Sequence, residues 1–382
     1  MSTRRSSRRV APTPLIPVTS VFTAPSAKRR RKNTSANGPK APATNSSEKP
    51  CGGEAKHGPS TASYSCAIMV PVPDDFSLAQ AVCSYGYYLV PPNLWVPDKN
   101  VRASGTFSRP LRFGEGLKYT AQCTILQAPS QAKGSIALKV DVAAERQLTE
   151  SDQDDIRSQV VRMFQTTADL TAWFKLNKEA EERHFGRLFR SPTLFEDMVK
   201  SVTACNIKFG GTIRMNKLLC ENFGRNQAFP TPEDLKGVQA EDLKERAKVG
   251  YRGDRILRLA EGFRDGSIDP AWLGAPERTR GEVLDFVKKL HGFGDFAASN
   301  VAMHLKFYDI VPMDSETVRH FKDVHGITTK NVKEVAPRVR QQYEPYAPYQ
   351  FLQYWWEMIR WHEVKRGKDV FMWQTHDFAN LS

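Results

Sequence analysis

A short glycine-containing segment at residues 290–294 separates two stretches whose apolar residues have helical spacing. Gly292 and Gly294 let the backbone approach a partner closely, because neither carries a side chain. The predicted helix that follows begins with unpaired N–H groups and a partial positive charge, which favour a phosphate. The segment therefore predicts a site for a nucleic-acid phosphate, with Gly292, Phe293 and Gly294 at the contact.

The same glycines match the pattern Gly292-x-Gly294-x-x-Ala297 of dinucleotide-binding folds. That pattern requires a strand before the first glycine. Residues 281–290 have helical spacing instead and end in Lys-Lys-Leu, so the dinucleotide interpretation is disfavoured.

Asp314 follows the hairpin and stands directly before a predicted helix at residues 315–324. Its simplest role is the N-cap of that helix, where an Asp contributes about 1 kcal/mol. A carboxylate at a helix N-terminus is expected to keep a low pKa and stay ionised. An ionised carboxylate can stabilise positive charge that develops on a sugar, so capping and catalysis are compatible roles.

The basic residues are concentrated at one end of the chain. Of 382 residues, 55 are Lys or Arg and 42 are Asp or Glu, which gives a net charge of +13. Residues 1–60 hold 12 of the basic residues and two acidic ones, a balance of +10, with a single aromatic residue. Such a segment cannot bury enough apolar surface to offset the entropy of ordering, so we expect a disordered arm.

A basic run at residues 27–33 within this arm indicates a nuclear import signal or a polyphosphate-binding patch. A run of solvated charge is the simpler alternative. An organellar transit peptide competes as well, because Arg-rich, Ser-rich and acid-free sequence continues up to Glu48. We expect a nuclear protein, with mitochondrion or plastid as the alternative.

Several classes of protein are excluded by composition. No window approaches the roughly 18 to 20 apolar residues that span a bilayer, and no apolar stretch follows the first arginines, so membrane and secretory interpretations fail. The cysteines lack the two-residue spacing of zinc and redox sites. None follows Cys220, which excludes a cysteine-ligated iron-sulfur cluster in the last third of the chain. We predict no metal site formed by side chains.

The remainder of the chain changes its periodicity near residue 149. Apolar residues alternate with polar ones over 119–125 and 136–142, which predicts antiparallel strands joined by a turn. From residue 149 the spacing becomes helical. We therefore expect an α+β protein with a sheet domain at 62–185 and a mainly helical domain at 186–382.

Two features of the helical part could bind a ligand. Glycines and short polar stretches interrupt the apolar helices at residues 204–208 and at 250–253. The stretch 343–361 holds too many aromatic residues for one buried helix face, so some of them should line a groove or pocket.

Together these residues resemble the helix-hairpin-helix (HhH-GPD) DNA glycosylase superfamily of base excision repair. The hairpin at 290–294 and the Asp314 that follows it carry the resemblance, which covers residues 62–365. Residues 195–223 resemble the first core helices, 250–252 a Gly-Tyr-Arg turn, 343–355 the last core helix, and the sheet region the N-terminal domain of the 8-oxoguanine and bacterial alkylbase (3-methyladenine) branches. The sequence is most similar to plant-type members.

The resemblance implies a role for each matching residue. Asp314 would be catalytic, and the hairpin would anchor a phosphate, with a monovalent cation held by backbone carbonyls as the one cofactor considered. Asn206, with Ile207 and Lys208 beside it, would fill or flank the vacated base position, although Asn206 could instead be an ordinary helix cap. Arg252 would contact DNA. The base pocket would be lined by Tyr349, Tyr354 and Trp355, for each of which core packing is the alternative.

Phe296 departs from the pattern of the superfamily. Bifunctional members carry a lysine two residues after the second hairpin glycine, and its amine attacks the sugar and leads to strand cleavage; Phe296 stands at that position. Lys288, Lys289 and Lys306 lie nearby in sequence, but helical spacing gives no reason to direct them at the site. We therefore expect a monofunctional glycosylase.

The expected partner is double-stranded DNA with an alkylated or oxidised base, bound by a monomer. A pocket rich in tyrosine and tryptophan suits a cationic alkylated base, although neutral oxidised bases also stack. Two other functions stay open. One is a DNA-binding or damage-sensing protein without activity, and the other is an abasic-site lyase that uses a displaced lysine.

Deletion of residues 1–60 should weaken nonspecific DNA binding and flatten its salt dependence, because this segment carries +10 of the net charge of +13. Each phosphate contact that is lost lowers the salt slope by about 0.9. Binding titrations over a range of salt concentrations measure the slope, and single-turnover excision at saturating protein should stay the same. An unchanged slope would show that the segment acts only as a targeting signal.

Overall fold

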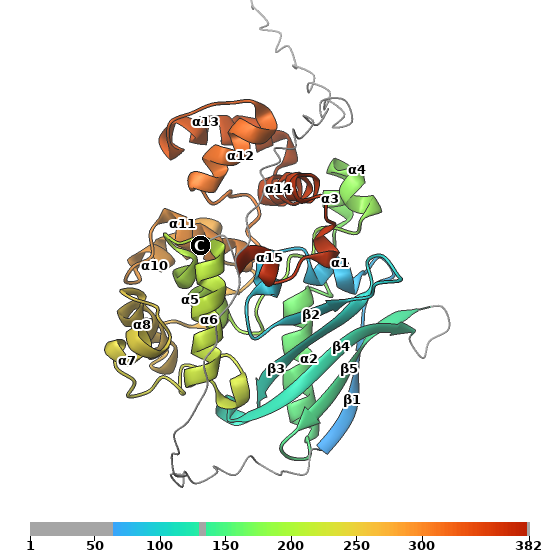
Figure 1. Ribbon diagram of the computed structural model, residues 1–382, viewed down its shortest axis with the longest axis vertical. Coiled ribbons are helices and arrows are strands. Elements are labelled where there is room, and N and C mark those ends of the chain that lie inside the picture. Colours follow the sequence, from blue (N-terminus) through green and yellow to red (C-terminus); the bar gives the residue numbers. More distant parts are fainter. Residues whose placement is uncertain (1–63, 130–134, 380–382) are drawn as a thin grey trace, which may run out of the picture. The chain divides into compact units, whose positions relative to one another are not determined.

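The computed structural model describes residues 64–129 and 135–379 (Figure 1). The basic segment at residues 1–60, with its run at 27–33, lies outside the described residues. Among the helices of the described part, none is both long and apolar enough to cross a bilayer.

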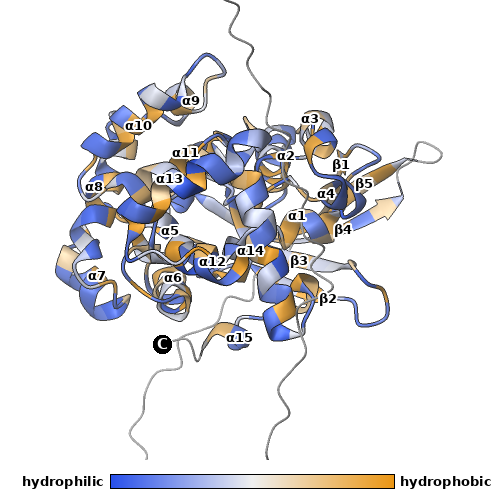
Figure 2. Ribbon diagram, turned by 90° about the horizontal axis from the view of Figure 1, so that it is seen from above, coloured by the Kyte–Doolittle hydropathy of each residue, from blue (hydrophilic) through white to orange (hydrophobic). Residues whose placement is uncertain are grey.

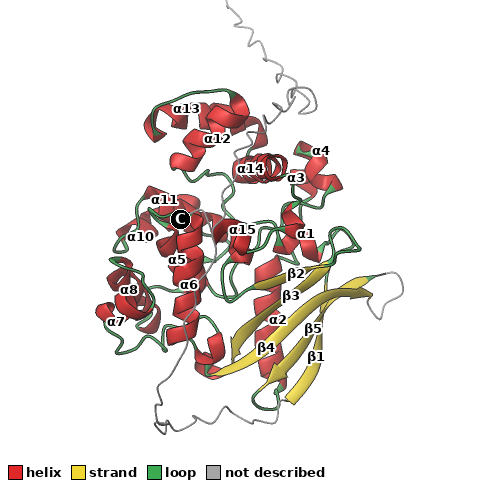
Figure 3. Cartoon of the chain, in the orientation of Figure 1, coloured by secondary structure: helices red, strands yellow, loops and turns green. Residues whose placement is uncertain are grey.

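Five strands form one antiparallel sheet in the order β1-β5-β4-β3-β2 (Figure 3). β4 and β5 pair as the alternation predicts, with Cys123 opposite Val142 and Ile125 opposite Val140. These four side chains are buried, whereas Gln122, which directly precedes Cys123, is exposed, and the predicted α+β class is confirmed. The strands are β1 (Tyr64–Pro71), β2 (Leu94–Pro97), β3 (Gly105–Phe113), β4 (Tyr119–Pro129) and β5 (Ile136–Ala144).

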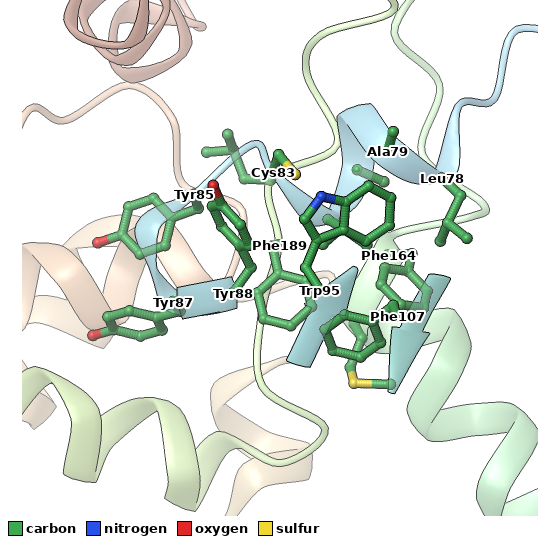
Figure 4. Packing of buried hydrophobic residues seen from close by; sticks show 14 of the residues in the cluster. Leu78, Ala79, Cys83, Tyr85, Tyr87, Tyr88, Trp95, Phe107, Phe164 and Phe189 are labelled. Carbon is green, nitrogen blue, oxygen red and sulfur yellow. The ribbon is translucent and has the colours of Figure 1, made fainter. Parts of the chain in front are cut away.

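Helix α2 (Glu150–Phe164) packs against this sheet at β1 and β3. It begins with a capping box, in which Thr149 Oγ1 accepts from Asp152 N at 3.2 Å and the Asp152 carboxylate accepts from Thr149 N at 2.7 Å. Its apolar face is buried, as the helical spacing predicts, and the Phe164 ring centroid lies 5.4 Å from that of Phe107 in β3 (Figure 4).

The segment between β1 and β2 folds into helix α1 (Leu78–Val82) and the 3₁₀ helix η2 (Gly86–Leu89). Tyr85 and Tyr87 of this segment are buried, and Figure 4 shows both rings pointing away from Trp95 and Phe107. Tyr87 stacks on His304 with ring centroids 4.9 Å apart, so the two tyrosines connect the sheet region to the helices beyond residue 186.

From residue 145 to residue 379 the chain contains helices and no strand. Figure 2 shows hydrophilic and hydrophobic residues mixed along α7, α8 and α10, which is typical of amphipathic helices at a surface. The remaining helices are α3 (Thr171–Leu176), α4 (Lys178–Glu182), α5 (Leu194–Ala204), α6 (Phe209–Phe223), α7 (Ala240–Arg246), α8 (Arg252–Arg264), α9 (Pro270–Leu273), α10 (Arg280–Lys289), α11 (Asp295–His304), α12 (Ser315–His325), α13 (Val332–Tyr343), α14 (Gln350–Arg366) and α15 (His376–Ala379).

The buried apolar side chains gather in two clusters. One is formed by α5, α8, α10, α11 and their connections. The other joins the sheet and α2 to residues of α12, α13 and α14, among them Phe321, Tyr343 and Phe351. All five strands of the described residues lie before the boundary predicted at residue 185, together with helices α1 to α4, whereas this second cluster crosses it. The division into domains at 62–185 and 186–382 stays a prediction.

A buried ion cluster connects the sheet to α5. Arg109 of β3 donates to both carboxylate oxygens of Glu196, at 3.2 and 2.9 Å, and Lys200 Nζ donates to the same carboxylate at 2.7 Å. All three side chains are at most 3% exposed. Burial alone would raise the pKa of Glu196, but the charges of Arg109 and Lys200 lower it below its usual range. The carboxylate therefore stays ionised and holds β3 and α5 in a fixed register.

Candidate active site

Asp314 is the N-cap of α12, as the sequence predicts. Its Oδ1 accepts from the backbone N of Thr317 at 3.0 Å and from the Thr317 hydroxyl at 3.2 Å. The Asp314 backbone N donates back to Thr317 Oγ1 at 3.3 Å, which completes a capping box. The carboxylate is thus held at a fixed place at the start of α12.

The expected low pKa of Asp314 is wrong in direction. Burial raises the pKa of Asp314 above its usual range, and the hydrogen bonds from Thr317 offset only part of this effect. The neighbouring Glu316 carboxylate raises it further. A helix N-terminus stabilises the charged form, but its effect is smaller than the cost of removing a carboxylate from water.

The charge of the Asp314 carboxylate acts on two buried tyrosines. Burial raises the pKa of Tyr354, and the charge of Asp314 raises it further. The same charge acts on Tyr85, whose pKa burial also raises. The Tyr354 hydroxyl is 3.4 Å from Thr317 Oγ1, so this ring touches the cap that holds Asp314.

Tyr85 connects this site to α11 and α14. Its hydroxyl donates to Asn300 Oδ1 at 3.3 Å, and its ring centroid lies 4.9 Å from Trp355 and 5.3 Å from His304. Trp355 Nε1 in turn donates to the carbonyl of Ser84 at 2.7 Å. Tyr85 was not among the predicted site residues, although the density of tyrosines at residues 85–88 is a signal like the aromatic density at 343–361.

The three aromatic residues predicted for the base pocket do not all lie together. Trp355 lies beside Tyr85, and Tyr354 contacts Thr317 in the cap of Asp314. Tyr349 instead precedes α14 as its N-cap, and its ring centroid is 6.1 Å from that of Trp173 in α3. We name Tyr85, Tyr354 and Trp355 the aromatic set of the site.

Two hollows in the described residues lie away from Asp314. One, of about 640 Å³, is lined by residues of α1, β2 and β3. The other, of about 460 Å³, lies between the sheet and α5 and is lined by Arg109, Glu196 and Phe229 among others. Asp314 and the aromatic set line neither. Tyr85 and Tyr354 are only 7% and 4% exposed, so their rings are packed against their neighbours.

The predicted hairpin connects α10 to α11 at residues 290–294. Gly292 has φ +86°, and a Cβ there would stand 2.3 Å from the Arg255 side chain, so only glycine fits. Arg255 donates to the Gly292 carbonyl at 3.3 Å and lies over the Tyr251 ring at 4.8 Å. Gly294 is the N-cap of α11, with φ −93° and open space where a Cβ would point.

The side chain of Phe293 does not face solvent as a DNA contact would. It is 5% exposed and belongs to the cluster of α5, α8, α10 and α11. The ring stands between two glycines, and its burial anchors the loop. Contact with DNA in this part of the hairpin therefore falls to the backbone.

The turn between α5 and α6 exposes Asn206, Ile207 and Lys208. Asn206 has φ +52°, and it caps neither helix, because Cys205 is the C-cap of α5 and Lys208 the N-cap of α6. Asn206 directly follows the C-cap of α5, and its positive φ is one that Asn adopts at helix ends, so the helix-end interpretation stays open; its side chain is exposed.

Arg252 is buried rather than exposed as its predicted DNA contact requires. It is 6% exposed, and its guanidinium donates to the carbonyls of Cys205 and Val249. Because Cys205 directly precedes Asn206, Arg252 supports the exposed turn from within. Arg252 and Arg255 also both lie over the Tyr251 ring, at 4.6 and 4.8 Å, so this arginine pair links the α5–α6 turn to the hairpin.

Phe296 lies in the first turn of α11, half-buried, where bifunctional superfamily members carry their lysine. Of the lysines considered as substitutes, Lys288 forms an ion pair with Asp295 at 2.6 Å. Lys306 is an exposed residue, although partial burial of its amine and the nearby Arg190 lower its pKa.

One curated protein is similar to part of the sequence. No protein-family model matches the sequence. The alkylbase DNA glycosidase-like protein mag2 of Schizosaccharomyces pombe is 22% identical over 172 residues, which are 44% of this chain and 79% of that protein.

Solved structures resemble most of the chain. MBOgg1 with a low-affinity DNA ligand has a TM-score of 0.56 and 16% identity, covering 80% of this chain and all 100% of that one. The Clostridium acetobutylicum 8-oxoguanine glycosylase/lyase bound to double-stranded DNA has a TM-score of 0.55 and 15% identity, covering 79% of this chain and 98% of that one. The Archaeoglobus fulgidus 3-methyladenine DNA glycosylase has a TM-score of 0.55 and 15% identity, covering 78% of this chain and 99% of that one. The described residues therefore have the fold of these glycosylases, as the resemblance predicts.

The two hairpin glycines should respond differently to alanine. Gly292→Ala should destabilise the protein by about 1 to 3 kcal/mol, because of its positive φ and the contact with Arg255. Gly294→Ala meets neither obstacle and should change stability by less than about 0.5 kcal/mol. Its methyl group should nevertheless weaken duplex binding, if a phosphate approaches the backbone there. Urea unfolding and fluorescence anisotropy with a duplex measure the two effects, and unchanged DNA affinity of Gly294→Ala would contradict the predicted phosphate contact.

Proposed function

We infer that this protein is a DNA glycosylase that hydrolyses the N-glycosidic bond of a damaged base in duplex DNA and leaves the strand intact. The observation that carries the proposal is Asp314, a partly buried carboxylate fixed at the start of α12 by Thr317, which also contacts Tyr354. It occupies this place in a fold whose solved examples include glycosylases for 8-oxoguanine and 3-methyladenine.

Asp314 would act on the charge that develops as the base leaves. The sugar becomes positive in the transition state, and a fixed carboxylate in a partly dehydrated site stabilises that charge more strongly than one in water. The same carboxylate would orient the attacking water on the sugar carbon. The capping box supports this role, because it holds one oxygen of Asp314 on Thr317 and leaves the other for the substrate.

The DNA would be held at the hairpin and at the exposed turn. The backbone of Gly292 and Gly294 would bind one phosphate, with a monovalent cation on the hairpin carbonyls as its counterion. Asn206, Ile207 and Lys208 would enter the position that the flipped base leaves, as small wedges do in kinked duplexes. Arg252 and Phe293 would position these two elements from within the protein.

The aromatic set favours a cationic alkylated base. Tyr85, Tyr354 and Trp355 offer ring faces beside an anionic group, and both attract a positively charged base. Because these rings are packed together, a base could enter only as they separate. Flipping costs a few kcal/mol, and it costs least for a damaged or mispaired base. An oxidised neutral base is the alternative substrate. We expect the protein to act as a monomer in the nucleus.

Replacement of Asp314 by Asn should remove base excision and leave DNA affinity nearly intact. Asn caps a helix as well as Asp, so the fold should be kept. Loss of a positioned charge typically lowers the rate about 100- to 1000-fold. Asp269→Asn at the exposed N-cap of α9 is the matched control and should be fully active.

Single-turnover excision on a panel of single-lesion duplexes measures the effect of Asp314→Asn. Because burial raises the pKa of Asp314, wild-type activity should be lost on acidification at a higher pH than for an ordinary aspartate. If the wild-type protein excises no base from any duplex yet binds DNA, it is a damage-sensing protein instead. Undiminished excision by Asp314→Asn would remove this residue from the mechanism.

The product should be an intact abasic strand, because an aromatic ring at Phe296 supplies no amine to attack the sugar. Cleavage of a lesion-bearing duplex should therefore appear only after alkali, and borohydride should trap no covalent complex. Efficient trapping that disappears in Lys288→Met, Lys289→Met or Lys306→Met would show that a displaced lysine performs lyase chemistry. Phe296→Lys tests the converse, since an amine restored there should give some trapping.

A further inference from the structure

Helices α12, α13 and α14 together place four side chains in one small polar cluster, which does not include Asp314. His320 and His325 come from α12, Tyr343 is the last residue of α13, and Glu357 comes from α14. The side chains of His320 and Tyr343 are fully buried, and those of His325 and Glu357 are only 14% exposed. The cluster is therefore almost closed to solvent.

Four atoms that can bind a metal ion lie close together in this cluster. Glu357 Oε2 lies 3.3 Å from His320 Nε2, 3.0 Å from His325 Nε2 and 2.7 Å from the Tyr343 hydroxyl. The Tyr343 oxygen is itself 3.2 and 3.3 Å from the two histidine nitrogens. The ligand atoms of His320, His325 and Glu357 all lie within 4.8 Å of one another.

These separations match the edges of a metal coordination shell. A tetrahedral zinc ion with bonds of about 2.0 to 2.1 Å keeps its ligand atoms about 3.3 Å apart. Four of the five separations given above lie between 3.0 and 3.3 Å, and the two histidine nitrogens lie within 4.8 Å of each other, so modest shifts of the side chains would place all four atoms around one ion. Both histidines present the same nitrogen, Nε2, and imidazole with carboxylate is a ligand set that suits Zn²⁺.

We propose that His320, His325 and Glu357 bind one Zn²⁺ ion, with the Tyr343 oxygen as fourth ligand; the ion replaces the hydrogen bond from Tyr343 to Glu357, and the phenol proton is released to water. Gln353 Nε2 donates to Glu357 Oε1 at 2.8 Å, which fixes the carboxylate and leaves Oε2 directed at the cluster. Outer hydrogen bonds of this kind orient the ligands of protein metal sites. The sequence alone predicts no metal site, because the ligands are distributed over three helices and form no recognised spacing.

The ion would fix α12 against α13 and α14. The His320 ring centroid lies 5.2 Å from that of Tyr354, and Tyr354 contacts Thr317 in the cap of Asp314. The metal would therefore position the start of α12 through Tyr354, without touching a substrate. This inference rests on the cluster's own contacts and holds whether or not the protein is a glycosylase.

Zinc binding by the full-length chain tests the proposal. The protein is stripped with a chelator, dialysed against buffered Zn²⁺ near neutral pH, and analysed for bound metal by mass spectrometry. We expect about one Zn²⁺ per chain and a Tm that rises with Zn²⁺ concentration, because a ligand that binds only the folded state stabilises it. Co²⁺ in place of Zn²⁺ should give the visible absorption of a tetrahedral site.

His325→Gln and Glu357→Gln should each lower zinc affinity by about 100-fold or more, because even the loss of an outer partner costs 10- to 100-fold. His362→Gln is the matched control: His362 also reaches from α14 to a carboxylate of α12, with Nε2 3.6 Å from Glu316, but no second histidine joins that pair. It should bind zinc like the wild-type protein.

Circular dichroism of each variant establishes that it is folded. If Glu357→Gln fails to fold, the partly exposed His325→Gln still decides the question. Failure of the wild-type protein to retain zinc, or equal retention by His325→Gln, would overturn the proposal and leave the cluster as a hydrogen-bonded contact. Neither result depends on base excision, so a failure here is distinct from a failure of the glycosylase proposal.

Discussion

The buried carboxylate of Glu196 restricts how the sheet and the helices can meet. It lies 2% exposed, between a guanidinium of β3 and an ammonium of its own helix. Removing either partner of a buried pair typically costs about 3 to 5 kcal/mol, so β3 and α5 must pack in the register that brings Arg109 and Lys200 together. α5 ends at the Asn206 turn, and Lys200 Nζ lies 5.5 Å from the Tyr87 ring centroid. The same ion cluster thus sets where the exposed turn stands relative to the tyrosines beside the candidate active site.

The candidate site is completed by residues that are distant in sequence. Tyr85 meets Asn300 across 215 residues, and Trp355 donates to Ser84 across 271. The sheet region therefore supplies more than a support for the helical part, because Tyr85 belongs to the same group of rings as Tyr354 and Trp355. A change that shifts η2 would alter the surroundings of Asp314 although it lies far from that residue in the chain. This explains why one apolar cluster contains both the sheet and α14.

Features that depend on local sequence could be predicted, and features that depend on burial could not. The alternation of β4 and β5, the helical spacing of α2, the hairpin and the N-cap at Asp314 follow from periodicity and capping rules, which need only a few neighbouring residues. The inward direction of Arg252 and Phe293 is a tertiary property, as is the separation of Tyr349 from Tyr354. The role of Arg255 at the hairpin was not predicted, because its partner, the Gly292 carbonyl, lies 37 residues away in the sequence. The histidines of α12 likewise give no signal in the sequence, because Glu357 and Tyr343 come next to them only in the folded chain.

The pKa of Asp314 shows how burial both hinders and helps this site. Taking the carboxylate from water favours its neutral form, which cannot stabilise a positive sugar. The same low polarity strengthens the attraction of the ionised form for positive charge, so a buried carboxylate is the more effective group once it is ionised. The two hydrogen bonds from Thr317 favour the ionised form and offset part of the cost. Because Thr317 also contacts Tyr354, the balance at Asp314 depends on how α12 packs against α14.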